Sequence, residues 1–229
     1  MQKSNQSAKT VGIIMDGNRR WAKAKGLNTF EGHEAGFNKI KEVVTWAIDA
    51  KVEHLFFYAF STENWNRSAI EVTYLMKLIE KAFRERMQEV EELGVRIRVA
   101  GERERFSSAL QQIMQDVEER SKNNSALSVT LCLSYGGKRD IVQAVNTLIK
   151  EGKNEISEDD IRESLWCADV PDPDIIIRPG GERRLSNFLM WQSAYSELFF
   201  LDTFWPDFSK EDFNAILVEF ETRERRKGT

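Results

Sequence analysis

The segment IIMDGNRRWA, residues 13–22, places several chemically capable side chains directly after a short apolar run. Asp16 is followed by a glycine, an asparagine and two arginines, which is more charge than a turn requires. Gly17 allows the backbone to approach a ligand closely, and guanidinium groups bind phosphate oxygens in pairs. Mg²⁺ is commonly held by one or two carboxylates together with substrate phosphates. The segment therefore indicates a site for a phosphate-bearing anion and a divalent cation.

A simpler explanation exists for the same residues. Asp16 before a helical segment is a typical helix N-cap, and DGNRRWA taken alone fits that role about as well as a binding site. The N-cap leaves the charges of Arg19 and Arg20 and the aromatic ring of Trp21 without a purpose. We therefore expect Asp16 to face a ligand.

The segment RPGGERRLSN, residues 178–187, is a second cluster of this kind. Arg178, Arg184 and Ser186 bracket a Gly-Gly bend and supply guanidinium and hydroxyl groups that bind phosphate oxygens. We call these three residues the anion clamp. Glu197, at the start of the next apolar run, is expected to be a second carboxylate for the metal. A solvated charge run is the ordinary explanation of GERR, but its position between two apolar runs weakens it.

Two further segments are less specific. Residues 61–67, STENWNR, are expected to form a mobile lid over the ligand, and we call them the lid segment; the alternative is a surface loop with Trp65 packed on the body. His33 in EGHEAG is able to donate to phosphate, although a lone histidine is more often a structural residue at a helix start. SEDDIRE, residues 157–163, is predicted to be a capped helix with an acidic first turn, not a metal motif.

The elements that position these segments follow from hydrophobic patterning. Short apolar runs predict strands at Val11–Met15, His54–Phe60, Val95–Gly101, Leu127–Gly137, Pro173–Gly181 and Glu197–Asp202. Helical spacing of apolar residues predicts helices within Ala35–Ile48, Val72–Met87, Phe106–Val117, Ile141–Ile149 and Phe213–Phe220. Strands that are apolar on both faces, each followed by a helix, predict a mainly parallel sheet flanked by helices. We see no linker or repeat, so residues 1–229 are expected to form a single α/β domain.

Ligands of open parallel sheets bind at the carboxyl ends of the strands. DGNRRW, STENWNR, YGGKRD and RPGGERRLSN follow the first, second, fourth and fifth predicted strands. We therefore expect these four polar loops to meet at one edge. The Met-, Leu- and Phe-rich stripe of residues 72–87 suits either the core or the wall of a pocket for a flexible hydrocarbon.

Composition restricts the class of protein. Hydrophobic residues make up 41% and charged residues 31% of the 229, which is ordinary for a soluble globular protein, and the net charge of −4 argues against broad nucleic-acid binding. Cys132 and Cys167 are expected to be reduced thiols. No apolar run reaches membrane-spanning length and the first ten residues contain no hydrophobic signal core. We therefore expect a cytoplasmic protein that does not bind nucleic acid.

Together the motifs resemble the cis-prenyltransferase family. IIMDGNRRWA, GHEAG, YAFSTENWNR, YGGKRDIV, IIIRPGGERRLSNFLMWQSAYSELFF, WPDF and RERRKG follow one another over nearly the whole chain. The resemblance implies a homodimeric α/β fold with a hydrophobic tunnel and a Mg²⁺-dependent enzyme. Such an enzyme condenses isopentenyl diphosphate repeatedly onto an allylic diphosphate such as farnesyl diphosphate. The implied product is a long-chain polyprenyl diphosphate, undecaprenyl diphosphate for the carrier lipid of cell-wall glycans, released at a membrane surface.

The resemblance also implies roles for individual residues. Asp16 becomes the metal and diphosphate carboxylate, and Glu197, from this chain or its dimer partner, completes the metal site. The allylic diphosphate is expected on Gly17, Asn18, Arg19, Arg20, Trp21 and His33. The lid is expected to contribute Ser61, Thr62, Glu63, Asn64, Trp65 and Arg67. Isopentenyl diphosphate is expected on Arg178, Arg184, Leu185 and Ser186. Arg226 and Gly228 resemble a tail motif that reaches a neighbouring subunit.

The proton acceptor is left open at this stage. Asn64 and Asp16 are the family's usual candidates, but a carboxamide is a very poor base. We assign Asn64 to positioning and leave the proton to diphosphate, water or Asp16.

Several positions depart from the family pattern. Val11-Gly12 replaces a motif with histidine, Pro179 replaces threonine, and Thr29 stands where the family often has an arginine. Arg19 stands where glycine is usual, so its guanidinium is a candidate replacement for the missing cation.

The same class of enzyme allows a shorter-chain synthase. Other functions fit the sequence less well. A non-catalytic accessory subunit that has lost the metal site would not need the retained residues Asp16, Asn64, Arg178, Arg184 and Glu197. A dinucleotide-binding oxidoreductase is disfavoured because no Gly-x-Gly-x-x-Gly turn follows the first strand. The all-helical trans-prenyltransferases carry paired acidic motifs, which this chain lacks.

Overall fold

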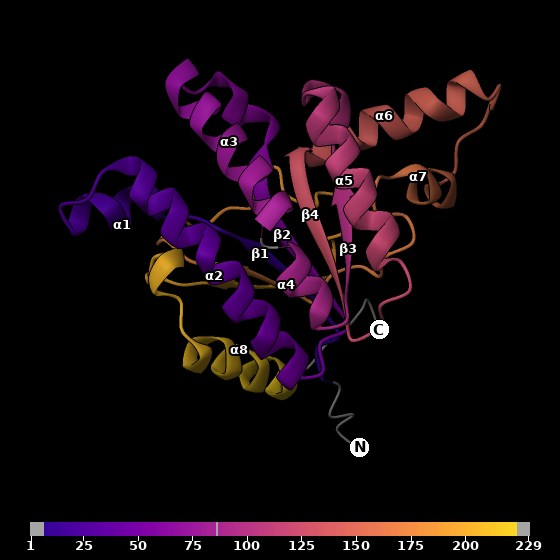
Figure 1. The fold of residues 1–229 in the computed structure, drawn as a ribbon. Helices are drawn as coiled ribbons and strands as arrows, with labels where there is room; N and C mark the ends of the chain where they lie inside the picture. The colour runs from indigo at the N-terminus through magenta and orange to yellow at the C-terminus, as the bar shows by residue number, and fades with distance from the viewer. Residues whose placement is uncertain (1–6, 86, 224–229) are drawn as a thin grey trace.

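A six-stranded sheet forms the centre of the computed structural model, which describes residues 7–85 and 87–223 (Figure 1). The strands are β1 Thr10–Ile14, β2 His54–Ser61, β3 Val95–Ala100, β4 Leu127–Tyr135, β5 Ile175–Arg178 and β6 Glu197–Phe200. Their order is β3-β4-β2-β1-β5-β6, and every neighbouring pair is parallel. The predicted α/β fold with a mainly parallel sheet is confirmed.

The strand limits follow the apolar runs closely. β2, β3, β4 and β6 begin at the residue that the pattern predicted, whereas β1 begins one residue earlier and β5 two residues later. β4 and β5 end before the predicted limit because the Gly-Gly pairs that follow them belong to helix α6 and to a turn. Hydrophobic patterning therefore locates the starts of these strands better than their ends.

The helices account for the remaining apolar stripes. They are α1 Asn18–Ala24, α2 Thr29–Asp49, α3 Ala69–Glu85, α4 Met87–Glu92, α5 Ser108–Ser121, α6 Gly137–Lys150, α7 Glu158–Ser164 and α8 Lys210–Thr222. The 3₁₀ helices are η1 Thr62–Asn66, η2 Arg103–Arg105 and η3 Trp205–Asp207. The predicted acidic capped helix is α7, in which Ser157 caps Asp160 and Asp160 reciprocates.

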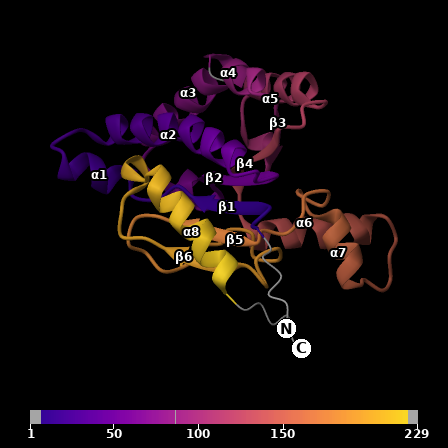
Figure 2. The same cartoon turned by 90° about the horizontal axis from the view of Figure 1, so that it is seen from below.

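The sheet is buried on both faces because successive side chains of a strand point in opposite directions. Leu55 and Phe57 of β2 belong to one core cluster and Phe56 and Tyr58 to the other. Helices α2, α3 and α5 cover the first face, and α6 and α7 lie on the opposite side (Figure 2). α8 also contributes side chains to the first cluster.

One connection differs from the expected alternation of strand and helix. Between β5 and β6, residues 179–196 form turns instead of a helix. Phe188 and Leu189 of this segment are fully buried in the second core cluster. The connection that carries Arg184 and Ser186 of the anion clamp is thus also part of the second core cluster.

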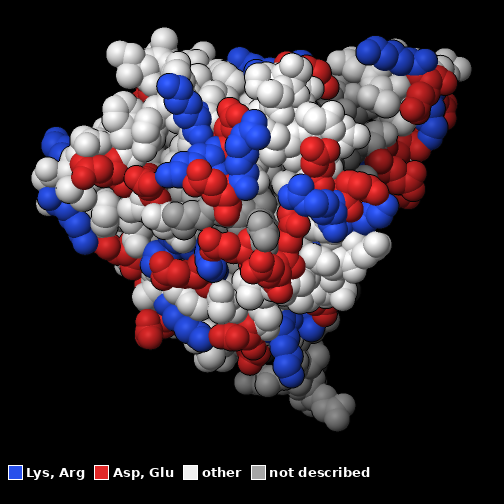
Figure 3. Space-filling view, in the orientation of Figure 1, with Lys and Arg blue, Asp and Glu red and all other residues white. Residues whose placement is uncertain are grey.

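Cys132 and Cys167 are both buried free thiols, as expected of reduced cysteines. Within residues 7–85 and 87–223, we find no helix with both the length and the apolar character needed to cross a membrane. The Arg226–Gly228 motif lies outside the described residues. On the face seen in Figure 3, Lys and Arg alternate with Asp and Glu and form no broad basic field.

Candidate active site

Three of the four polar loops meet at the carboxyl edge of the sheet, as the strand order requires. β1 lies between β2 and β5, so the segments that follow these three strands are neighbours. They enclose a cavity of about 1420 Å³. Six of its lining residues are Lys or Arg and three are Asp or Glu, an excess of cations that favours an anionic ligand. The fourth loop, at the start of α6, lies beside this cavity and not in its wall.

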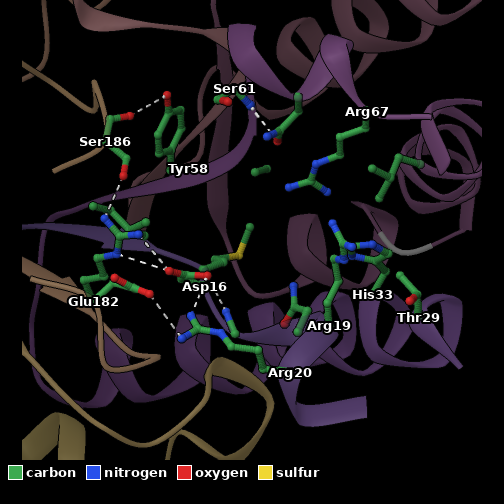
Figure 4. Close-up of a pocket in the computed structure, with 18 of the residues that line it drawn as sticks. Asp16, Arg19, Arg20, Thr29, His33, Tyr58, Ser61, Arg67, Glu182 and Ser186 are labelled. Atoms are coloured by element: carbon green, nitrogen blue, oxygen red, sulfur yellow. Dashed lines mark hydrogen bonds and ion pairs between the residues drawn. The ribbon is translucent and has the colours of Figure 1, made fainter. Parts of the chain in front are cut away.

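Asp16 and Arg178, which both line the cavity, form an ion pair. Asp16 lies close to Arg20 and Glu182 (Figure 4). Asp16 Oδ2 accepts hydrogen bonds from Nη2 and Nε of Arg178 at 2.7 and 3.3 Å. Asp16 Oδ1 accepts from the Gly17 amide at 2.6 Å and lies 3.2 Å from Nη2 of Arg20. The Arg178 side chain is only 4% exposed. The pair is held rigidly because both carboxylate oxygens have fixed partners.

The N-cap explanation of Asp16 is wrong. The N-cap of α1 is Gly17, and its φ of 99° lies in the left-handed region that favours glycine. A Cβ on Gly17 would also approach Cδ1 of Phe204 to 2.7 Å. This glycine turns the chain so that Asp16 faces the cavity and not the amides of α1.

The glycines of GHEAG have a packing role. A Cβ at Gly32 would lie 2.3 Å from the carbonyl oxygen of Asn18, and one at Gly36 would lie 2.3 Å from Oδ1 of Asn18. Only glycine at both positions lets α1 lie against α2. These contacts position Asn18 and Arg19 at the cavity.

The anion clamp is assembled around Arg178. Its Nη1 donates to Oγ of Ser186 at 2.8 Å and also to the carbonyl oxygen of Arg184. Ser186 has a φ of 49°, an unusual conformation for a non-glycine residue. The Ser186 carbonyl accepts a hydrogen bond from the Tyr58 hydroxyl at 3.3 Å. The backbone is therefore held in a strained form that turns Ser186 Oγ toward Arg178.

The outer part of the clamp is more open. The Arg184 side chain is 59% exposed and pairs with Glu182 at 2.5 Å. Arg20 lies 3.5 Å from the other oxygen of Glu182. These guanidinium groups are accessible to an anion that enters from solvent.

Three lining residues, Arg19, His33 and Arg67, form a second ionic cluster around Glu71 of α3. Glu71 Oε1 accepts from Nη1 of Arg67 at 3.0 Å and lies 3.2 Å from Nε2 of His33, and Arg19 lies 3.8 Å from Oε2. Burial lowers the pKa of His33 although Glu71 opposes this, so the imidazole is neutral at pH 7. His33 reaches the cavity as a neutral, structurally bonded side chain.

The lid segment contains a short regular element. Residues Thr62–Asn66 form η1, a 3₁₀ helix in which Asn64 Oδ1 accepts from the Ser61 amide at 3.1 Å. The Asn64 amide thus fixes its own segment, which agrees with a positioning role. The alternative for Trp65 is the correct one, because its ring packs on Phe60 and its Nε1 donates to Ser134 at 2.9 Å.

Most predicted site residues line the cavity, and some do not. Lining residues from the prediction are Asp16, Gly17, Asn18, Arg19, Arg20, His33, Ser61, Glu63, Asn64, Arg67, Arg178, Arg184 and Ser186. Trp21, Thr62, Trp65 and Leu185 are not in its wall. Trp21 stacks under Lys25 instead, and Leu185 packs against the second core cluster.

Glu197 lies at the wrong edge of the sheet to share a site with Asp16 of the same chain. It pairs with Ile175, which is level with Val11. Asp16 lies five residues beyond Val11, roughly 15 Å further along the strand direction. Glu197 is bonded to Arg223 at 2.5 Å. The start of a parallel strand is at the amino edge, so of the two alternatives for Glu197 only the one supplied by a dimer partner stays a prediction.

The donor set fits a metal that arrives with a diphosphate. Among the residues that the structure describes, no three His, Cys, Asp or Glu side chains form a cluster able to hold a metal alone. Asp16 offers one carboxylate inside a cavity rich in guanidinium groups. Mg²⁺ commonly takes one or two protein carboxylates and completes its shell with phosphate oxygens and water.

Several residues in or beside the cavity had no predicted role, among them Glu71, Tyr58 and Asn187. Glu71 was detectable, since it stands four residues after Arg67, the spacing of a helical ion pair. Tyr58 was placed in a strand but given no role, although its hydroxyl supports Ser186. Asn187 stands at the end of the clamp motif, where nothing in its type or spacing suggested a role.

Comparison with known proteins agrees with this geometry. The sequence model of the undecaprenyl diphosphate synthase family matches residues 14–228. The chain belongs to this family. An isoprenyl transferase of Neisseria gonorrhoeae is 42% identical over 218 residues, which cover 95% of this chain and 88% of that relative. The family resemblance seen in the motifs is confirmed, and the protein is an isoprenyl transferase by family.

Two further relatives carry names that describe ligands. Ditrans,polycis-undecaprenyl-diphosphate synthase of Legionella pneumophila, named as specific for (2E,6E)-farnesyl diphosphate, is 41% identical over 224 residues, covering 95% of this chain and 94% of the relative. Lavandulyl diphosphate synthase from Lavandula x intermedia, solved with dimethylallyl diphosphate, has a TM-score of 0.92 at 31% identity. It covers 97% of this chain and 99% of the other. The fold of this family member is thus shared with a diphosphate-binding enzyme.

Proposed function

We propose that this cavity binds an allylic diphosphate beside isopentenyl diphosphate and joins them repeatedly into a long cis-polyprenyl diphosphate, with farnesyl diphosphate as the starter and undecaprenyl diphosphate as the product. The observation that carries this proposal is the buried Arg178–Asp16 pair in a cavity whose wall has an excess of cations. The name of the Legionella relative supports the starter and the product.

The two sides of the cavity suit two diphosphates. Asn18, Arg19 and Arg20 hold the allylic diphosphate, and the anion clamp holds isopentenyl diphosphate. Asp16 stands between them, since it is bonded to Arg20 on one side and Arg178 on the other. Holding both substrates in one orientation converts a bimolecular reaction into an effectively intramolecular one.

The reaction is a displacement at carbon. The allylic C–O bond breaks and its electron pair leaves with the diphosphate, while the isopentenyl double bond forms the new C–C bond. Arginines that already point at the leaving diphosphate stabilise the charge that develops there. Asp16 would hold Mg²⁺ together with phosphate oxygens, and the bound metal would stabilise the same charge.

The last step releases a proton from the former isopentenyl unit, and its C–H electrons form the new double bond. Both oxygens of Asp16 have guanidinium or amide partners, which makes Asp16 a poor acceptor. Asn64 is bonded to the Ser61 amide and has no basic group. We therefore assign the proton to an oxygen of the released diphosphate, with Asn64 positioning the reacting carbons.

The hydrocarbon chain needs an apolar path away from these charges. Ile14, Met15, Ala59 and Leu75 supply apolar lining on the inner side of the cavity. Leu75 belongs to the α3 stripe, which supports the role of that stripe as a pocket wall. As the product lengthens it passes along α3 and leaves at a membrane surface.

A shorter product is the second candidate. The similarity to lavandulyl diphosphate synthase, solved with the five-carbon dimethylallyl diphosphate, favours it. One experiment separates the two: purified protein is incubated with farnesyl diphosphate, radiolabelled isopentenyl diphosphate and Mg²⁺, and the products are sized by chromatography. Long polyprenyl products support the proposal, products extended by one or two units support the second candidate, and no product refutes both. The same purified protein, sized by light scattering, tests the homodimer.

A further inference from the structure

Asn187 lies between two segments that are far apart in the sequence. Its Oδ1 accepts a hydrogen bond from the Lys138 amide at 2.8 Å, and its carbonyl oxygen accepts from the Gly137 amide at 2.7 Å. Its Nδ2 donates to Oε1 of Glu63 in η1 at 2.9 Å. The residue is therefore fixed on the start of α6 and reaches the lid segment from there.

The backbone and the neighbouring glycine both favour this contact. Asn187 has a φ of 67°, and asparagine tolerates the left-handed region better than most residues. A Cβ on Gly136 would lie 2.7 Å from Nδ2 of Asn187 and 2.7 Å from Oγ1 of Thr62. The φ of Gly136 is −161°, which any residue adopts. Space, and not conformation, is what requires glycine there.

The hydrogen bonds to Glu63 favour its ionised form. Burial alone would raise the pKa of Glu63, but the hydrogen bonds from Asn187, Ser61 and Thr62 outweigh it and lower the pKa. Glu63 is therefore ionised at neutral pH, and hydrogen bonds to an ionised acceptor are stronger than neutral ones.

The contact joins the lid segment to the anion clamp. Glu63 precedes Asn64 in the lid segment, and Asn187 follows Ser186 of the anion clamp. Glu63 and Asn187 both line the cavity. Movement of the lid away from the clamp would break the hydrogen bond between them.

We propose that Asn187 is a positioning residue that ties the lid segment to the anion clamp through Glu63, so that Asn64 of the lid keeps one geometry relative to the groups that hold isopentenyl diphosphate. This inference rests on the proposed function. It differs from a purely structural role because it predicts a direct dependence on the chemical pairing of Asn187 with Glu63.

An exchange of the two partners tests the proposal. Asn187→Asp sets a second carboxylate against Glu63 but keeps the acceptor for the Lys138 amide. Glu63→Gln keeps the shape of the side chain and removes its charge. In the double variant, the new amide at position 63 donates to the new carboxylate at position 187, so the hydrogen bond returns with donor and acceptor exchanged. Asn146→Asp, on the exposed side of α6, adds the same charge away from the contact.

Two measurements are made on each variant. We expect Asn187→Asp to raise KM for isopentenyl diphosphate about tenfold with a smaller change in kcat, and the double variant to return to within about threefold of wild type. Hydrogen exchange of the peptide that covers residues 61–67 should become about fivefold faster in Asn187→Asp and slow again in the double variant. Asn146→Asp should change neither quantity.

The hydrogen-exchange and kinetic measurements distinguish failure of the inference from failure of the proposed function. Wild-type protein that makes no prenyl product refutes the proposed function, while the exchange data still test the tie. Unchanged exchange in Asn187→Asp, or a double variant no better than Asn187→Asp, overturns the inference. A fall in thermal midpoint that accounts for the slower turnover, with no recovery in the double variant, also overturns it.

Discussion

Arg178→Lys is the most informative single substitution in the site. It keeps the positive charge but removes the planar guanidinium group with its several N–H donors. Arg178 donates to the Asp16 carboxylate from Nε and Nη2. Its Nη1 donates to Ser186 Oγ and to the Arg184 carbonyl. The lysine ammonium group carries its donors on one nitrogen, so it is able to keep the contact to Asp16 but not the contacts to Ser186 Oγ and the Arg184 carbonyl. The preserved charge pairs with Asp16, so the fold should survive.

The size of the effect follows from the lost contacts. A hydrogen bond that involves a charged group contributes about 1.5–3 kcal/mol, so loss of two contributes about 3–6 kcal/mol. Each 1.4 kcal/mol is a factor of ten in rate. We therefore expect kcat/KM for isopentenyl diphosphate to fall about 10²- to 10⁴-fold. Circular dichroism at the assay temperature should match wild type, whereas the thermal midpoint should be lower, because the two lost hydrogen bonds also stabilise the fold.

Arg184→Lys is the matched control, since it makes the same chemical change at an exposed guanidinium. Arg184 pairs through its side chain with Glu182 and is 59% exposed, and exposed ion pairs contribute about 0–1 kcal/mol. Its kcat/KM should fall by about tenfold or less, measured by radiolabelled product formation over a range of isopentenyl diphosphate. Arg178→Lys within tenfold of wild type, or Arg184→Lys as slow as Arg178→Lys, would refute the reasoning.

Three further outcomes are expected. Asp16→Ala should lower turnover by about 10³-fold or more while circular dichroism is unchanged, and normal activity of the folded variant would exclude Asp16 from the metal and diphosphate site. Arg19→Gly should raise KM for farnesyl diphosphate about three- to tenfold, because a charged hydrogen bond of a partly exposed group is lost; Thr29→Arg added to it should reverse the rise, and no recovery would show that the two positions do not replace each other. His33 is a base whose pKa is lowered in the folded protein, so its contribution to stability is complete above its ordinary pKa of 6.5 and is lost as the pH falls below that value. Urea unfolding at pH 7.5 and 5.5 should therefore show a larger loss in wild type than in His33→Gln, and equal losses would contradict the assignment.

The fold was predictable because its signals are local. Six apolar runs marked the six strands, and the rule for parallel sheets brought Asp16 and Arg178 to one edge although 162 residues separate them. The same rule places Glu197, which starts a parallel strand, at the edge opposite Asp16 of the same chain, so a Glu197 supplied by a dimer partner stays a prediction. The α/β fold therefore needed only patterning, and the site needed the direction of each strand as well.

The errors depend on contacts that no spacing reveals. Trp65 packs between Phe60 and Phe106 and leaves the cavity wall, and residue 106 lies in a different part of the chain. Asn187 gains its role from an unusual φ and from the space left at Gly136. Both depend on packing between distant segments, which a single sequence does not contain.

The connection between β5 and β6 has a consequence for anyone who wishes to redesign this enzyme. Phe188 and Leu189 are fully buried against one face of the sheet, within a few residues of Arg184 and Ser186 of the anion clamp. Changes made there to alter selectivity would loosen the molecule at the same time, so libraries aimed at this connection should yield mostly insoluble protein. The α3 side offers independent adjustment, because Leu75 faces the hollow from a helix that carries none of the clamp.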